Sequence, residues 1–155
     1  MRRIEDGTDL RDAYLELAGE ARHSLAILSR DLEPGVLGTG EFCEAVKRLV
    51  LENRRAEVQI LAHDPAAAAR TTHRLIELAR RLSSFIEIRR LGPDDRELTE
   101  AFIVADRRLV VHRIYGDRPQ GEYAEDRARA RELDQRFREL WERAEFDPEV
   151  RRLHL

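Results

Sequence analysis

Three short apolar runs of the sequence each end in a residue that could do chemistry. Ser29 and Arg30 close the first run, His63 follows the second, and Arg89 and Arg90 close the third. If these runs are parallel strands, their ends meet at one edge of a sheet, where α/β proteins bind ligands. The arginines could clamp an anion there, and the imidazole of His63 could accept or donate a proton near neutral pH. The plainer interpretation is a set of exposed loop charges.

No established catalytic or cofactor motif accompanies these residues. Gly35, Gly38 and Gly40 are spaced G-x-x-G-x-G, which is neither a P-loop nor a dinucleotide fingerprint. The sequence also lacks the G-x-S-x-G elbow of serine hydrolases, the H-E-x-x-H zinc motif and any Cys/His cluster with metal-ligand spacing. We therefore expect no metal and no cofactor.

The single cysteine and three of the histidines favour structural interpretations. Cys43 borders the apolar face of a predicted helix, so we expect it in the core rather than as a reactive thiol. His73 lies inside a predicted helix and is expected on its surface. His23 and His154 have no sequence context that favours a role.

The composition is that of a folded chain with a very polar surface. The 155 residues are 42% hydrophobic and 38% charged, which excludes collagen-like and disordered classes and fits one domain over residues 1–155. A net charge of −3 argues against strong nucleic-acid binding. In the arginine-rich last helix, the spacing of Glu132 with Arg136 and of Glu139 with Arg143 predicts ion pairs on a solvated face.

We expect the protein in the cytoplasm of a bacterium or archaeon, without membrane contact. No run approaches the roughly 18 consecutive apolar residues of a membrane span, and the first seven residues hold no apolar stretch of signal-peptide length. A single cysteine also fits a compartment in which disulfides do not form.

Hydrophobic periodicity defines the elements that would hold the candidate residues. Helical spacing is found in four segments and strand patterns in five, and a turn at Asp106 joins the last two strands as a hairpin. In chain order we expect a helix that Thr8 caps and that runs to Ala21, a strand 24–29, a helix 39–53, a strand 57–62, a helix 64–82, strands 85–88, 101–105 and 109–111, and a helix 130–144.

This order of elements predicts the class of fold. Helices between successive strands demand crossover connections, which make neighbouring strands parallel and place helices on both faces of the sheet. The late hairpin adds antiparallel strands. We expect a three-layer α/β/α domain with a mixed, mostly parallel sheet that ends in an antiparallel hairpin, with its core over about residues 8–144 and a C-terminal tail at 145–155.

The span 8–144 resembles one half of a phospholipase D-like domain. Segment 20–29 looks like the family's helix leading into an apolar strand, and 52–61 resembles its basic turn followed by a V-x-I-L strand. Segment 99–111 looks like the hairpin that carries the family's H-x-K-x4-D motif, and 137–141 looks like its closing helix. The resemblance implies a phospholipase D-like half that pairs with itself as a homodimer.

The chain departs from that family at the motif that does its chemistry. Thr99 stands where the family has histidine, Ala101 stands where it has lysine, and only Asp106 is kept. In the family the histidine forms a covalent intermediate with phosphorus, and the lysine offsets charge on the phosphoryl oxygens. Threonine without a base and alanine supply neither effect, so no residue is assigned a catalytic role.

Two functions are compatible with this altered motif. In the first, which we favour, the domain is a non-catalytic interaction or ligand-sensing module for an anionic small molecule or a partner protein. In the second, His112 and Arg113, which align with the family's small G-S-x-N residues, form a rebuilt enzyme site for a phosphate or carboxylate compound. The second requires these side chains to converge with His63, Ser29 and Arg30.

Both functions use the same candidate ligand pocket. Asp106 has a competing role as the turn former of the hairpin, which we consider the stronger interpretation. The predicted pocket residues are Ser29, Arg30, Thr99, Asp106, His112 and Arg113, with His63 at the rim.

Overall fold

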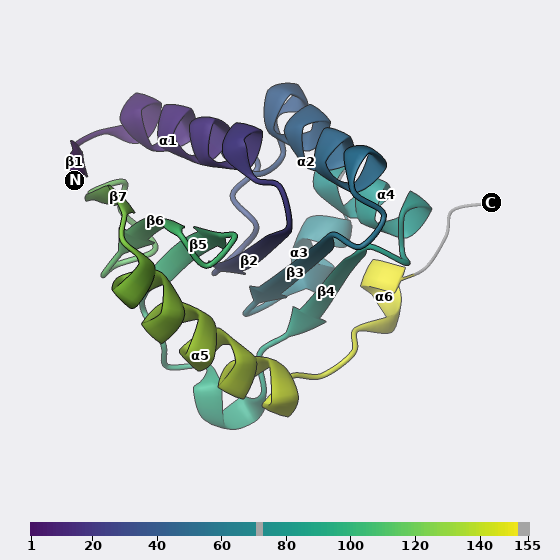
Figure 1. The fold of residues 1–155 in the computed structure, drawn as a ribbon. Helices are drawn as coiled ribbons and strands as arrows, with labels where there is room; N and C mark the ends of the chain where they lie inside the picture. Colours follow the sequence, from purple (N-terminus) through teal and green to yellow (C-terminus); the bar gives the residue numbers. More distant parts are fainter. Residues whose placement is uncertain (71–72, 152–155) are drawn as a thin grey trace.

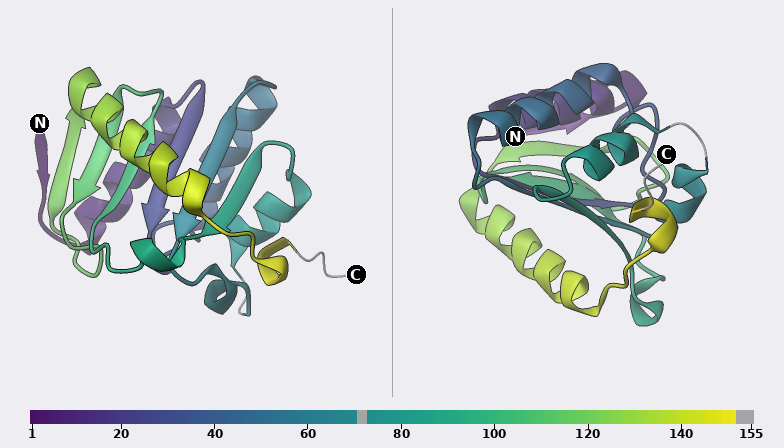
Figure 2. Two further views of the ribbon diagram at one scale, coloured as in Figure 1. Left: turned by 90° about the horizontal axis from the view of Figure 1, so that it is seen from below. Right: turned by 90° about the vertical axis from the view of Figure 1, so that its right-hand side faces the viewer.

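The computed structural model describes residues 1–70 and 73–151, and within them a seven-stranded sheet carries helices on both faces (Figure 1). The strands are β1 (Arg2–Ile4), β2 (Ser24–Ser29), β3 (Glu57–Ala62), β4 (Ile86–Arg90), β5 (Ala101–Ala105), β6 (Leu109–Arg113) and β7 (Gly121–Glu125). The helices are α1 (Gly7–Glu20), α2 (Gly40–Glu52), α3 (Pro65–Ala69), α4 (Arg74–Arg81), α5 (Arg127–Arg143) and α6 (Pro148–Arg151), with a 3-10 turn η1 (Pro93–Asp95). Helices α1, α2 and α4 cover one face, and α5 crosses the other diagonally (Figure 2).

The expected three-layer fold with a mixed sheet is confirmed, but fewer neighbouring strands are parallel than expected. The strand order is β1-β7-β6-β5-β2-β3-β4, and only β2–β3 and β3–β4 pair in parallel among the described strands. The hairpin β5–β6 pairs with β2 antiparallel, and β7 and β1 extend the sheet antiparallel. Strands β1 and β7 were not predicted because Arg-Arg-Ile and Gly-Glu-Tyr-Ala-Glu lack an alternating apolar pattern.

Two of the predicted helices differ from the prediction, one at its N-cap and one by an interruption. Asp6, not Thr8, caps α1, since its carboxylate accepts a hydrogen bond from the amide of Asp9 at 2.8 Å. The helix expected over 64–82 is two helices, α3 and α4, because His73 is extended (φ −122°) and caps α4. Positions 71–72 of that prediction lie outside the described residues.

Residues 145–151, expected as a C-terminal tail, pack against the fold. Glu145 pairs with Arg90 as an isolated β-bridge beyond β4. Val150 of α6 is buried in the core, and its carbonyl accepts a hydrogen bond from the Arg80 guanidinium at 2.9 Å.

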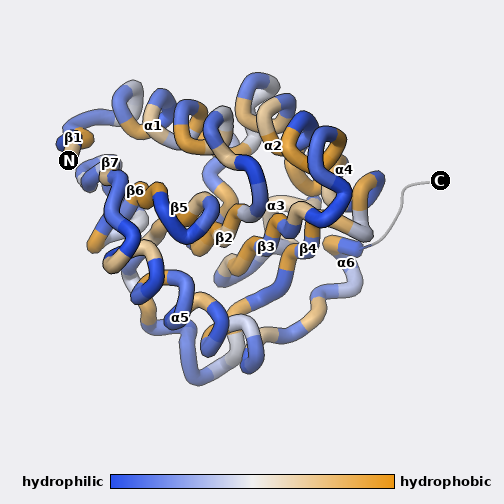
Figure 3. The backbone as a smooth tube through the Cα atoms, in the orientation of Figure 1, coloured by the Kyte–Doolittle hydropathy of each residue, from blue (hydrophilic) through white to orange (hydrophobic). Residues whose placement is uncertain are grey.

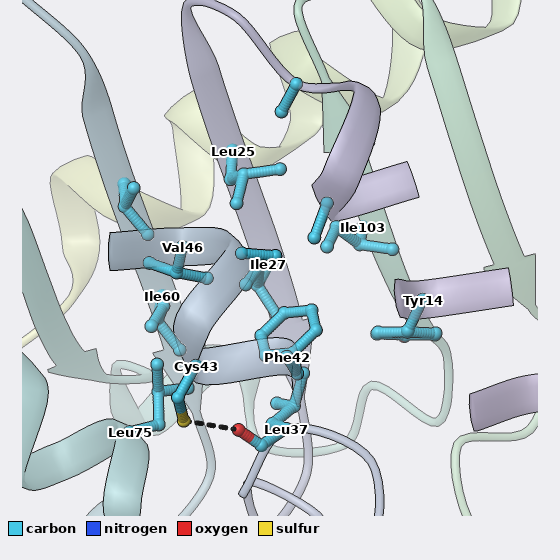
Figure 4. Close-up of a cluster of buried hydrophobic side chains, with 14 of the residues drawn as sticks. Tyr14, Leu25, Ile27, Leu37, Phe42, Cys43, Val46, Ile60, Leu75 and Ile103 are labelled. Carbon is cyan, nitrogen blue, oxygen red and sulfur yellow. Dashed lines mark hydrogen bonds between the residues drawn. The ribbon is translucent and has the colours of Figure 1, made fainter. Parts of the chain in front are cut away.

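Successive residues of the central strands pack against opposite helical layers, as the pleat requires. Ile27 belongs to the core below α1 and α2, whereas Leu28 packs with Phe102 and Phe137 below α5. The apolar residues lie mainly on the strands and the inward helix faces (Figure 3). Cys43 lies in the larger core, as expected, and its thiol contacts the Leu37 carbonyl at 3.5 Å (Figure 4). Burial raises the pKa of this thiol to about 11, so it carries little thiolate at neutral pH.

Ion pairs connect α5 to other parts of the fold. The acidic partners lie outside the helix, so the helix sequence alone does not reveal them. Arg136 pairs with Glu100 before β5, and Arg143 pairs with Asp95 of η1 at 3.0 Å. The spacing predicts that each arginine pairs with the acidic residue four positions before it. Instead, both arginines pair with residues outside the helix. These arginines therefore bind the helix to the rest of the fold and are not only exposed charges on its outer face.

Candidate functional site

Most of the predicted pocket residues lie at the carboxyl-terminal edge of β2 and β3. Strands β5 and β6 run beside β2 so that the start of β5 and the end of β6 lie next to the end of β2. This register brings Ser29, Thr99 and Arg113 to one edge. Arg30 and His63 follow β2 and β3 there, and the His63 amide donates to the Arg30 carbonyl at 3.1 Å.

Asp106 lies at the opposite end of the sheet and is not part of this edge. Asp106 and Arg107 both have positive φ (56° and 53°), as a tight hairpin turn of the I′ type requires. The Asp106 carboxylate accepts hydrogen bonds from the amides of Arg22, His23 and Ser24 at 2.9, 2.7 and 3.0 Å. The aspartate therefore ties the hairpin to the start of β2, which is the structural role that competed with the pocket.

The edge itself is filled by a buried ion pair that the sequence did not reveal. Arg113 is 1% exposed, and its guanidinium donates to both carboxylate oxygens of Glu33 at 3.1 and 2.5 Å. It also donates to the carbonyl of Gly116 at 3.0 Å and to the hydroxyl of Tyr14 at 3.3 Å. Burial raises the pKa of Tyr14, against the lowering effect of the Arg113 charge. The positive charge of Arg113 is thus neutralised inside the protein.

The loop after β2 holds Glu33 in place. Ser29 is fully buried, and its hydroxyl accepts a hydrogen bond from the Leu32 amide at 3.1 Å. Leu32 has a φ of 60°, a conformation that costs a non-glycine residue about 1–2 kcal/mol. The ring of His73 donates to the Leu32 carbonyl at 2.8 Å and accepts from the Leu75 amide. His73 is therefore buried, not on a helix surface as expected, because one ring nitrogen bonds to this loop and the other caps α4.

The β6–β7 loop closes the position of the family's lysine and bonds to the exposed residue at the position of its histidine. Ala101 is fully buried beside Gly116, where a Cβ would lie 3.2 Å from the Ala101 Cβ. The Thr99 hydroxyl donates to the Ile114 carbonyl at 3.2 Å, and the Thr99 carbonyl accepts from the Gly116 amide at 2.6 Å. Both polar groups of Thr99 are therefore used within the fold.

His112 and Arg113 do not converge, because neighbouring residues of a strand point to opposite faces. Arg113 contacts Tyr14 of α1, whereas the His112 ring faces α5. The His112 Nδ1 atom accepts from the Arg129 guanidinium at 3.0 Å, and its Nε2 atom therefore donates to Glu100 at 2.8 Å. Burial and the charge of Arg129 lower the pKa of His112. No ring nitrogen is left to serve as a general base.

His63 is half-buried at the same edge, and its ring bonds to a loop rather than to the side chain of another candidate. Its Nε2 atom donates to the Leu98 carbonyl at 3.1 Å, and its Nδ1 atom has no partner in the described part of the chain. Burial lowers the pKa of His63, and the charge of Arg30 adds to that effect. The Arg30 side chain is exposed.

A cleft of about 860 Å³ lies on the α5 face of the sheet, beside the edge strand β1. Of the predicted residues only His112 lines it, together with Arg3, Arg129 and the exposed loop residues Tyr115 and Arg118. In residues 1–70 and 73–151 no group of three His, Cys, Asp or Glu side chains could hold a metal ion. His154, an unassigned histidine, lies outside the described residues.

Searches of known structures identify the class of fold. TrmBL2, an archaeal chromatin protein with a described mode of DNA binding, matches with a TM-score of 0.65 and 14% identity over 94% of this chain and 54% of that one. The present chain thus spans about half the length of TrmBL2. Nuc from Salmonella typhimurium, a phospholipase D family member, matches with a TM-score of 0.60 and 12% identity over 86% and 88% of the two chains. NucT from Helicobacter pylori matches at 0.59 and 14% over 91% and 94%.

These matches confirm the phospholipase D-like fold of the half-domain. A family model described as Domain of unknown function (DUF7931) covers residues 6–153, and the chain belongs to that family. A comparison with curated proteins finds no significant match. No helix in the described ranges combines the length and apolar character needed to span a bilayer.

Two groups at these sites, Glu33 and Arg129, were not predicted from the sequence, and neither was the burial of Arg113. Arg113 continues the alternation of Leu109 and Val111, which face the larger core, so its burial had a local signal. Glu33 and Arg129 had none, because each acts on a side chain far along the chain.

Proposed function

We propose that this protein is a non-catalytic phospholipase D-like domain that acts by binding a ligand or partner rather than by cleaving a phosphodiester. The support comes from the edge where the family's motif falls. Thr99 and Ala101 replace the histidine and lysine, and Ala101 is buried under Gly116. Arg113, the strand partner of Ala101, is bonded to Glu33.

The single observation that carries this proposal is the Arg113–Glu33 pair. A phosphate at this edge would have to compete with a carboxylate that already accepts two hydrogen bonds from the guanidinium. Breaking a buried pair costs several kcal/mol, so the guanidinium is unavailable to offset charge in a transition state.

The alternative of a rebuilt enzyme site gains no support from the geometry. It requires His112 and Arg113 to act on one substrate, but they face opposite sides of the sheet, and both ring nitrogens of His112 are bonded. DNA binding, described for TrmBL2, is not proposed either. The net charge is −3, and Arg136 and Arg143 of α5 are paired with acidic residues.

Hydrolysis of bis(4-nitrophenyl) phosphate, a generic phosphodiester, tests the proposal. We expect the wild-type protein and the His112→Ala and Thr99→Ala variants to give the same rate as buffer. Turnover by the wild type that disappears in either variant would overturn it. Turnover that is equal in all three preparations and is lost on further purification comes from a contaminant, whereas turnover that persists in the purified protein would also overturn the proposal. An affinity for duplex DNA tighter than about 1 μM at physiological salt would overturn the exclusion of nucleic acid.

The proposal includes a homodimer and a cytoplasmic location. The homodimer is taken from the resemblance, in which one half-domain pairs with another. Light scattering of the purified chain is expected to give twice the mass of 18.1 kDa, and a concentration-independent monomer would contradict it. Cell fractionation tests the location.

A further inference from the structure

The cleft beside β1 brings together side chains from β1, β6, β7, α5 and the loop between β6 and β7. In the sheet Arg3 of β1 pairs with Glu122 of β7, and His112 of β6 pairs with the same Glu122, so all three lie on the α5 face. Arg129 of α5 closes one side of the cleft, and the β6–β7 loop supplies Tyr115 and Arg118. Its volume of about 860 Å³ falls in the range of small-molecule sites.

Two of the arginines at this cleft have no acidic partner. The guanidiniums of Arg3 and Arg118 form no ion pair with any residue of the described ranges, and Arg118 lies over the Tyr115 ring at 5.1 Å. Arg129 differs, because it donates to Glu122 at 2.7 Å and to His112. In the cleft the charge of Arg129 is therefore neutralised by Glu122, whereas the guanidiniums of Arg3 and Arg118 are free to bind a ligand.

An apolar surface adjoins these cations. Ile114 is 67% exposed and Tyr115 is 51% exposed, and both line the cleft. They belong to the loop whose Gly116 amide donates to the Thr99 carbonyl, so their backbone is held while their side chains face solvent. A ligand with a flat or branched apolar body could cover both side chains.

The charge of the lining sets the charge of its ligand. Three arginines and the carboxylates of Glu5 and Glu122 give a formal sum of +1, with His112 neutral because its Nδ1 atom accepts a hydrogen bond. That sum matches one negative charge, and the two free guanidiniums offer the paired donors that carboxylates and phosphates accept.

We propose that this cleft binds a small organic anion with an apolar body, held at its anionic end by Arg3 and Arg118 and at its apolar end by Ile114 and Tyr115. This inference rests on the proposed function, since it places the ligand site of a non-catalytic domain. The site is distinct from the buried part of the phospholipase D-like motif edge, because Ala101 and its strand partner Arg113 lie on the α1 side of the sheet and not on the α5 side.

Four probes separate the charge of the ligand from its apolar body. Benzoate carries both, benzamide has the same shape without the charge, acetate has the charge without the ring, and phenyl phosphate replaces the carboxylate by a phosphate ester. For a fragment of this size we expect a Kd on the order of 10 mM for benzoate. The readout is the shift of backbone amide NMR signals, among which Gly121 and Gln120 report on the cleft.

Variants of the exposed arginines test the assignment without disturbing the fold. Arg118→Ala and Arg3→Ala are each expected to weaken benzoate binding about tenfold, the loss of one charged hydrogen bond. Arg55→Ala is the matched control, because Arg55 is also exposed but lies in the turn before β3, at the opposite end of the sheet. It is expected to leave the Kd unchanged.

The outcomes distinguish this inference from the proposed function. The site is supported if benzoate or phenyl phosphate shifts the signals at the cleft, acetate and benzamide shift them less, and the shifts are lost in Arg118→Ala. Of benzoate and phenyl phosphate, the one that binds more tightly identifies the acid group of the ligand. The absence of shifts with both anions, or shifts that persist in both arginine variants, would overturn the site while an inert phosphodiester assay leaves the proposed function standing. Turnover in that assay would overturn the proposed function alone.

Discussion

The guanidinium of Arg113 and the carboxylate of Glu33 form a two-pronged ion pair between residues 80 positions apart in the chain. The pair lies at the sheet edge where the phospholipase D-like motif would place its lysine, next to Ala101. A cation is therefore kept at this edge, but it comes from β6 rather than β5, and the protein supplies its counterion. The geometry of this pair predicts that it contributes to the stability of the fold.

Removing the counterion should destabilise the fold strongly. Glu33→Gln leaves the buried Arg113 guanidinium without its carboxylate, and we expect the free energy of unfolding to fall by about 3 kcal/mol. Arg113→Met should cost a similar amount, and the double variant Glu33→Leu/Arg113→Met less than the sum of both. Urea unfolding monitored by circular dichroism measures these values.

Glu52→Gln provides the control for that series. Glu52 ends α2 on the exposed surface, and its substitution should change stability by less than about 0.5 kcal/mol. Equal stabilities of the Glu33→Gln and Glu52→Gln proteins would show that the pair does not hold the loop.

The family's lysine should not fit back into this chain. In Ala101→Lys an ammonium would enter a fully buried position against Gly116 and close to the charge of Arg113, so we expect a loss of about 3 kcal/mol. Thr99→His, at an exposed position, should cost less than about 1 kcal/mol. Thermal unfolding of the two single variants measures the difference, and a stable Ala101→Lys protein would show that the edge is open after all.

The hairpin turn supplies a third test, at the other end of the sheet. Asp106→Ala removes the acceptor of three backbone amides and places alanine at a positive φ, so we expect a loss of about 2–4 kcal/mol. Asp106→Asn should lose less than half of this, because asparagine tolerates that φ and keeps one side-chain oxygen. Chemical unfolding compares them, with the exposed Asp94→Ala as control. Equal losses in the alanine and asparagine variants would assign the effect to charge alone.

The sequence could predict the parts of the fold that local patterns determine. The run Ser24–Ser29 and the hairpin around Asp106 were recognisable, because apolar runs of strand length and a turn former are local signals. The edge strands β1 and β7 were not recognisable, because polar side chains that pair at a sheet edge have no apolar alternation. The strand order followed no local rule either, so the parallel share of the sheet was overestimated.

The candidate site was harder to predict than the fold, for a physical reason. The register brings Ser29, Thr99 and Arg113 to one edge, but burial and hydrogen bonding decide what each group can do. Arg113 is not a free cation, because Glu33 in the loop after β2 pairs with it. A sequence shows the arginine but not its distant counterion.

The two half-buried histidines predict a stability that falls in mild acid. Burial, with help from the charge of Arg129, lowers the pKa of His112, and burial lowers the pKa of His63. The unfolded chain, whose histidines titrate near about 6.5, then binds more protons than the folded chain below that pH. Their contribution to stability is therefore complete above the unfolded pKa and is lost as the pH falls toward the folded values. Urea unfolding between about pH 7.5 and pH 5 measures this slope, and His112→Gln should reduce it.

The role of Arg129 in that shift can be measured directly. In Arg129→Met the positive charge beside the imidazole is gone and the Nδ1 atom loses its donor, so the NMR titration midpoint of His112 should rise toward about 6.5. Arg55→Met, at the far end of the sheet, should leave the midpoint in place. A low midpoint in all three proteins would assign the shift to burial alone, and a midpoint above about 6.5 in the wild type would show that the ring is charged and that Arg129 cannot donate to it.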